Sequence, residues 1–216
     1  IYGTERWHAG LDIGCSYGDT ICAADGDGTI LIQAGAYPVS APFDISTPMT
    51  IRGGYAGTDD TTLDPEGRIS MLRAIPGSGI GIVLRQSVNA PGSCNVYERI
   101  GFAGAGDGFL QNTEATSVTF RNCRFCFNGC DATTTGGQGA AIVGTAQTSA
   151  NIDVRFEGCL FDGNARNNSS VYGMAGAGIL ADTVNSLTVD GCTFLTNGVA
   201  FGDTSIDCGR EYGMEI

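Results

Sequence analysis

The sequence is poor in charge, and above all in positive charge. Charged residues make up 16% of its 216 residues, and 11 Lys and Arg stand against 23 Asp and Glu, which gives a net charge of −12. A surface this acidic repels the phosphates of nucleic acids and of anionic membranes. We therefore expect no nucleic-acid partner, whereas cation binding and an extracellular setting are compatible with the charge.

Long apolar runs are also missing. The sequence contains no stretch of 18 or more apolar residues, so we expect no membrane span. It does not begin with Met, and no basic segment followed by an apolar one marks a secretion signal. We expect the chain to be a processed or excised piece of a protein.

Glycine and cysteine, in contrast, are abundant. The 34 glycines follow no strict triplet, which excludes collagen, and 42% hydrophobic residues argue against a disordered chain. A chain of this length can build one domain with a sizeable core. Nine cysteines favour an oxidising compartment, and their odd number leaves at least one thiol free or paired between chains. We expect an extracellular or cell-surface location.

Three similar units recur in the second half of the chain: VTFRNCRFCFN, VRFEGCLFDGN and LTVDGCTFLTN. Apolar and polar residues alternate in each unit, which is typical of a β-strand. An Asn or Gly interrupts the alternation, and these residues tolerate a left-handed backbone. Each unit therefore predicts a strand, one sharp bend and a second strand. The shared positions are Cys123, Cys159 and Cys192, then Phe125, Phe161 and Phe194, and finally Asn128, Asn164 and Asn197.

A glycine-rich motif alternates with these units, as GSGIGIVL, GDGFL, GGQGAAIV and GMAGAGIL. Strand, bend, strand and then a glycine-rich strand describe one coil of a parallel β-solenoid, in which stacked coils share one core. Consecutive coils are about 4.8 Å apart, so identical positions stack into ladders. We predict an aromatic stack of the phenylalanines, an amide ladder of the asparagines and an inward column of the cysteines.

The first half of the chain is less regular. Strands are expected in GTILIQAGAYPV (28–39), MTIRGGYAGTDD (49–60), RISMLRAI (68–75) and NVYERIGF (95–102). Residues 1–24 fit no coil, and we expect them to form an N-terminal cap or extension in which Cys15 and Cys22 close a loop. Residues 25–216 are expected to form the β-helix repeats, which could continue beyond the chain.

The combination of Phe-x-x-Asn with Gly-Gly-Ala-Ile-like strands resembles the repeats of the polymorphic outer-membrane proteins. Those proteins are surface adhesins with right-handed β-helix passengers. Segments 28–37 and 50–58 are similar to secreted bacterial β-helix proteins of the pectate-lyase-like superfamily. The resemblance covers roughly residues 25–216 and implies an all-β fold, a right-handed parallel β-helix.

The resemblance to pectate lyases also implies a candidate catalytic set, with calcium on Glu157 and Asp190 and Arg155 as the base. Calcium takes six to eight oxygen ligands, more than two carboxylates supply. The alternative is a surface ladder in which Arg121 pairs with Glu157 across coils. Hydrolase chemistry would need a histidine, and the only one, His8, lies in the expected cap.

Other candidate sites are weaker. GTDDTTLDPEG gathers four acids that could bind calcium, Asp59, Asp60, Asp64 and Glu66. Cys126 and Cys130 are spaced for a disulfide, and zinc is disfavoured because strand parity points Cys123 and Cys126 to opposite sides. NNSS offers glycosylation sequons at Asn167 and Asn168, in an expected outer loop. We expect no resident cofactor, calcium being the one cation that these patterns allow.

The repeats and the lack of a complete catalytic set lead to one functional interpretation. We expect a non-catalytic structural or adhesive β-solenoid, secreted or on the cell surface, that associates end to end into an extracellular filament or sheath or continues into a longer chain. Host or matrix glycans are the expected ligands. The alternatives are a polysaccharide lyase or hydrolase, or a carbohydrate-binding module that uses exposed aromatics such as Tyr97 and Tyr172.

Overall fold

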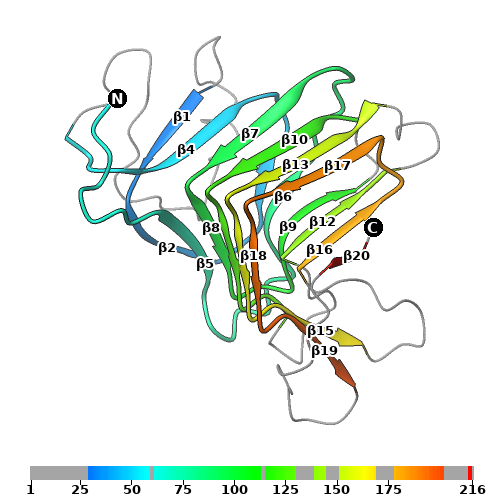
Figure 1. The fold of residues 1–216 in the computed structure, drawn as a ribbon. Helices are drawn as coiled ribbons and strands as arrows, with labels where there is room; N and C mark the ends of the chain where they lie inside the picture. The colour runs from blue at the N-terminus through cyan, green and yellow to red at the C-terminus, as the bar shows by residue number, and fades with distance from the viewer. Residues whose placement is uncertain are drawn as a thin grey trace.

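Parallel β-strands build the whole of the described structure. A computed structural model describes residues 29–58, 61–112, 115–129, 139–144, 151–168, 178–201 and 214–215. In these residues the strands form three six-stranded sheets and one two-stranded sheet, without an α-helix (Figure 1). The predicted parallel β-solenoid is therefore confirmed. None of the described residues belongs to a helix that could span a membrane.

Each coil contributes one strand to each of the three large sheets. Sheet 1 consists of β1 (Thr29–Gln33), β4 (Thr50–Tyr55), β7 (Cys94–Glu98), β10 (Ser117–Arg121), β13 (Asp153–Glu157) and β17 (Ser186–Asp190). Sheet 2 consists of β2 (Gly35–Val39), β5 (Ser70–Ala74), β8 (Ile100–Ala103), β11 (Arg124–Cys126), β14 (Leu160–Asp162) and β18 (Thr193–Leu195). The colour in Figure 1 accordingly runs from blue at β1 to orange at β17 along the stack.

Sheet 3 contains the glycine-rich strands. It consists of β3 (Phe43–Ile45), β6 (Ile82–Gln86), β9 (Asp107–Asn112), β12 (Ala140–Val143), β16 (Ile179–Asp182) and β20 (Met214–Glu215). A separate two-stranded sheet joins β15 (Ala165–Asn168) and β19 (Gly198–Phe201), below the coils in Figure 1. All pairings between these strands are parallel, because equivalent segments of successive coils stack on each other.

A single left-handed residue turns the chain from sheet 1 to sheet 2. Asn122, Gly158 and Gly191 have φ angles of 52°, 60° and 59°. Arg99 occupies the same position one coil earlier, with a φ of 52°, and divides segment 95–102 into β7 and β8. A left-handed conformation costs an ordinary residue about 1–2 kcal/mol, so Arg99 is held there by the pairing of the strands on both sides.

The phenylalanines of sheet 2 stack inside the solenoid. Ring centroids of Phe125 and Phe161 are 4.7 Å apart with an interplanar angle of 4°, and those of Phe161 and Phe194 are 4.8 Å apart at 5°. Phe102 extends the stack by one more coil, 5.0 Å from Phe125. Aromatic pairs in this distance range contribute about 0.5–1.5 kcal/mol beyond the burial of their area, so the stack couples each coil to the next.

A second aromatic stack runs along the inner face of sheet 1. Tyr97 and Phe120 are 5.2 Å apart, and Phe120 and Phe156 are 4.9 Å apart. The two stacks meet edge to face, as Phe120 and Phe125 do at 5.2 Å and 79°. The core is therefore a double column of rings along the solenoid axis.

The asparagines form an amide ladder at the turn after sheet 2. The Nδ2 of Asn128 donates to Oδ1 of Asn164 at 2.9 Å, and the Nδ2 of Asn164 donates to Oδ1 of Asn197 at 2.8 Å. Each Nδ2 also donates to a carbonyl oxygen of the preceding coil, that of Phe102, Phe125 or Phe161. All three amides are buried, so these bonds replace the water that the side chains lose on folding.

Glycines at the start of the sheet 3 strands, or directly before them, make room for this ladder and for the aromatic stack. A Cβ on Gly108 would lie 2.8 Å from Nδ2 of Asn128, and one on Gly139 would lie 2.9 Å from Cβ of Phe125. Both distances are too short for a real contact, so an alanine would displace its neighbours. The glycine motif and Phe-x-x-Asn are thus two halves of one packing arrangement.

Candidate functional site

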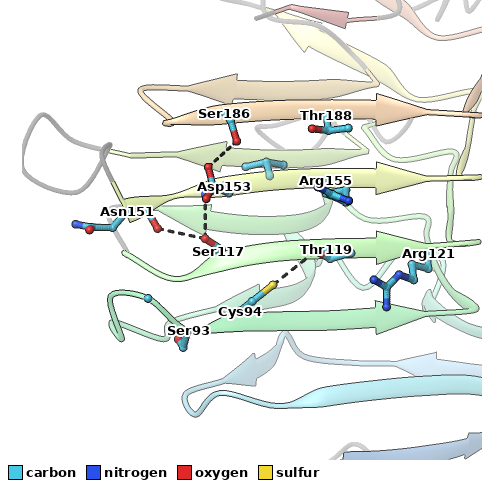
Figure 2. A pocket seen from close by; sticks show the side chains of 12 residues that line it. Ser93, Cys94, Ser117, Thr119, Arg121, Asn151, Asp153, Arg155, Ser186 and Thr188 are labelled. Atoms are coloured by element: carbon cyan, nitrogen blue, oxygen red, sulfur yellow. Dashed lines mark hydrogen bonds between the residues drawn. The ribbon is translucent and has the colours of Figure 1, made fainter.

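A groove of about 630 Å³ follows the outer face of sheet 1 across β7, β10, β13 and β17 (Figure 2). Side chains alternate along a strand, so Val118 and Phe120 fill the core while their neighbours Ser117 and Thr119 face the groove. The same alternation brings Ser186 and Thr188 of β17 to this face. Small hydroxyl side chains therefore cover much of the groove floor.

One end of the groove is a hydrogen-bonded chain around Asp153. Ser186 Oγ and Asn185 Nδ2 donate to Oδ1 of Asp153 at 2.5 and 2.8 Å. The main-chain N–H of Asp153 donates to Ser117 Oγ at 2.9 Å, and Ser117 Oγ donates to the carbonyl oxygen of Asn151 at 3.2 Å (Figure 2). The bonds from Ser186 and Asn185 lower the pKa of Asp153. Asp153 is thus a fixed, ionised hydrogen-bond acceptor.

The other end of the groove is lined by the predicted Arg155, and the predicted Glu157 bonds to it. Arg121 Nε donates to Glu157 Oε2 at 2.8 Å, and a terminal nitrogen of Arg155 donates to Oε1 at 3.2 Å. Asp190 lies opposite Glu157 in the next coil, so the structure places all three candidates together. The two guanidinium groups lower the pKa of Glu157, which makes it a poor proton donor near neutral pH.

The acidic loop before β5 is closed by an ion pair. Arg68 donates to both carboxylate oxygens of Asp64, with the shortest distance 2.8 Å, and the main-chain N–H groups of Glu66 and Arg68 donate to Oδ1. These bonds, foremost the one from the Arg68 side chain, lower the pKa of Asp64. Glu66 contacts the same guanidinium at 3.5 Å. Asp64 thus organises its own loop through arginine and main-chain donors.

Metal-binding clusters of three or more His, Cys, Asp or Glu side chains do not occur in the described part of the chain. The remaining members of the predicted calcium loop, Asp59 and Asp60, lie outside it. The expected cap (1–24), with Cys15, Cys22 and His8, also lies outside the described residues. The same holds for Cys130 and Tyr172.

Every cysteine in the described residues is a free thiol that forms no disulfide. These cysteines are Cys94, Cys123, Cys126, Cys159 and Cys192. The predicted Cys126–Cys130 disulfide therefore has no support, since Cys126 is one of the free thiols. Burial raises the pKa of Cys126, which disfavours its thiolate.

Two predicted surface features take a different form in the structure. Asn167 and Asn168 lie in β15, which pairs with β19, so a short strand stands where an outer loop was expected. Insertions in two successive coils supply each other with main-chain hydrogen bonds, which favours a strand pair.

Tyr97 is fully buried and donates its hydroxyl to Gln86 Oε1 at 2.8 Å, so it is not an exposed aromatic ring on which a sugar could stack.

Arg155 was predicted from the sequence, but the serine and aspartate residues of the groove were not, although a signal for three of them exists. Ser117, Asp153 and Ser186 all stand directly before the first apolar residue of the three aligned units. A polar column at a shared outward position was therefore visible in the repeat alignment.

Comparison of the chain with protein-family models, with curated proteins and with solved structures finds no match in any of the three.

Proposed function

We propose that this chain is a non-catalytic adhesive module of a secreted or cell-surface protein, and that it binds glycans in the groove on sheet 1. The observation that carries the proposal is the groove itself, a long polar surface on a rigid sheet. Hydroxyl, amide, carboxylate and guanidinium groups in one row match the alternating donors and acceptors of a sugar polymer.

The arrangement of charges supports binding over catalysis. A general acid or base needs a pKa near the working pH, and environments that raise a carboxyl pKa are the usual means of reaching it. Here the pKa values of Asp153 and Glu157 are both lowered. These groups remain ionised at neutral pH and act as hydrogen-bond acceptors. Arg155 and Arg121 form ion pairs with Glu157, and these pairs hold the two guanidinium groups in place as hydrogen-bond donors for a ligand.

The ladders inside the solenoid support the structural side of the proposal. Two aromatic stacks and one amide ladder join consecutive coils of the described structure. Such a repeat forms a stiff rod that can present the same groove along its length. End-to-end association into an extracellular filament or sheath extends this role. Filaments in negative-stain microscopy would support it, and compact monomers alone would contradict it.

A glycan array probed with the fluorescently labelled chain tests the binding proposal. We expect binding to at least one class of immobilised polysaccharide and loss of that binding in Thr188→Arg, whose long side chain fills the groove. Thr193→Arg is the matched control, because Thr193 is also exposed but lies on sheet 2. Binding to no glycan on the array, or equal loss in both variants, would contradict a glycan site on sheet 1.

The same proteins test the alternative of a lyase or hydrolase. Release of unsaturated sugars or reducing ends from a bound polysaccharide would overturn the non-catalytic proposal. In that case Glu157→Gln and Arg155→Lys would separate the candidates, since Arg155 lines the groove and Glu157 is its hydrogen-bond partner.

A further inference from the structure

Three cysteines form a column at the corner between sheets 1 and 2. Cys123, Cys159 and Cys192 each follow the left-handed bend residue of their coil. Each thiol contacts the main-chain carbonyl oxygen two residues earlier, at 3.5, 3.5 and 3.4 Å. The three side chains therefore share one orientation, and their sulfur atoms point the same way in three successive coils.

Main-chain hydrogen bonds hold the column in register. The N–H of Leu160 donates to the carbonyl oxygen of Cys123 at 2.9 Å, and the N–H of Thr193 donates to that of Cys159 at 2.8 Å. Stacked strands are about 4.8 Å apart, which lies within the Cα separation of roughly 4.4–6.8 Å that disulfides span. A bond between neighbouring coils thus needs little movement of the backbone.

Cys159 contacts the next cysteine of the column. Its main-chain N–H donates to Sγ of Cys192 at 3.4 Å. All three thiols are free.

The three thiols differ in access. Cys123 and Cys159 are each 1% exposed, whereas Cys192 is partly exposed. A reagent from solution therefore reaches Cys192 before it reaches the other two. A hollow of about 400 Å³ is lined by Cys123 and Cys159 together with Arg99 and Arg124.

We propose that Cys159 and Cys192 are a disulfide-forming pair that links two coils, with a small-molecule disulfide such as oxidised glutathione as the oxidant. In the first step the Cys192 thiolate attacks one sulfur of oxidised glutathione, forms a mixed disulfide and releases one glutathione. In the second step the Cys159 thiolate attacks Sγ of Cys192, forms the Cys159–Cys192 bond and releases the second glutathione. The two cysteines lose two electrons and two protons, and two reduced glutathiones carry them away.

The environment of each thiol suits this order. Hydrogen bonding by Cys123 lowers the pKa of Cys159, which favours its thiolate in the second step. Burial raises the pKa of Cys192, so the first step should accelerate as the pH rises and its thiolate fraction grows. Cys123 has a raised pKa, chiefly because of its burial, and remains a thiol beside the pair. This linkage is independent of the glycan site, because none of the three cysteines lines the groove on sheet 1.

Peptide mapping of the full chain tests the pair directly. The reduced protein is equilibrated with oxidised glutathione, free thiols are alkylated, and the digest is analysed without reduction by mass spectrometry. We expect a linked peptide pair containing Cys159 and Cys192, absent in Cys192→Ser and retained in Cys126→Ser, which removes a free thiol outside the column. Full alkylation of Cys159 and Cys192, a stable glutathione adduct on Cys192 without a link, or a link from Cys159 to Cys123 would each overturn the proposal.

Urea unfolding gives a second readout that needs no variant. A link between residues 159 and 192 restricts the unfolded chain, so oxidation should move the unfolding midpoint to higher urea and dithiothreitol should reverse the shift. Oxidised and reduced wild-type protein with the same midpoint would contradict a link between coils.

Discussion

Asn164 joins three coils through one side chain. It accepts from Nδ2 of Asn128 at 2.9 Å and donates to Oδ1 of Asn197 at 2.8 Å, and its Nδ2 also donates to the carbonyl oxygen of Phe125. Its Oδ1 further accepts the main-chain N–H of Asn128. No partner in this set is exposed to water, so the amide cannot be replaced by solvent.

Asn164→Ala should therefore destabilise the solenoid strongly. The substitution leaves several buried donors and acceptors without partners, and an orphaned buried group costs about 1–3 kcal/mol. We expect the free energy of unfolding to fall by about 3 kcal/mol, measured by urea titration with circular dichroism. Asn112→Ala is the control, because Asn112 is exposed at the end of β9 and should change stability by less than about 0.5 kcal/mol. Equal effects of the two would contradict the ladder's role.

The central ring of the sheet 2 stack should matter more than an exposed ring. Phe161 is fully buried between Phe125 and Phe194, whereas the Phe127 side chain is 59% exposed. Removal of a buried phenylalanine costs about 3–5 kcal/mol. We expect Phe161→Ala to lower the free energy of unfolding by that amount, and Phe127→Ala to lower it by less than about 1 kcal/mol. Thermal and urea unfolding measure both, and comparable losses would argue against a coupled stack.

Glycine at the entry to sheet 3 should be required at some positions and dispensable at others. A Cβ on Gly139 would lie 2.7 Å from the carbonyl oxygen of Gly178, whereas one on Gly81 would meet nothing within 4 Å. Overpacking costs about 1–3 kcal/mol, so Gly139→Ala should be destabilising by that amount. Gly81→Ala should be neutral or stabilise by up to about 1 kcal/mol, because it restricts the unfolded chain. The two midpoints in urea test the difference, and a tolerated Gly139→Ala would refute the proposed packing.

The Asp64–Arg68 pair should make stability depend on acid pH. The pKa of Asp64 is lowered in the folded state, so its contribution is present above the ordinary carboxyl pKa near 4 and disappears as pH falls through the folded value. We expect Asp64→Asn to cost stability at pH 7 and to cost less at pH 3, where the wild-type carboxylate is increasingly protonated. Unfolding at the two pH values measures this.

Asp44→Asn provides the comparison for that experiment, because its contact with Arg85 is longer, at 3.7 Å, and both side chains are about half exposed. It should change stability little at either pH. A difference between wild type and Asp64→Asn that stays constant from pH 7 to pH 3 would show that the ion pair is not what stabilises the loop.

Local patterns were enough to predict the coil. Alternation at 118–120 and the left-handed tolerance of Asn122, Gly158 and Gly191 are properties of a few adjacent residues, and they predict two strands joined by a bend. Repetition of those patterns then requires stacking, because one coil cannot bury its apolar face alone. The first half of the chain was harder to predict, because Arg99 forms the bend there and arginine is not a residue type that normally indicates a left-handed bend.

The repeat pattern was thus sufficient to predict the solenoid and the residues that recur at equivalent positions in its coils. The contacts between outward side chains, such as Ser186 with Asp153 and Arg155 with Glu157, became visible in the folded molecule. These contacts depend on the rotamers of exposed side chains and on the exact register between coils. The repeat alone specifies which strands pair, but it does not specify these details. The position of Tyr97 in the core likewise became visible only in the folded molecule, because the burial of a side chain depends on every coil around it.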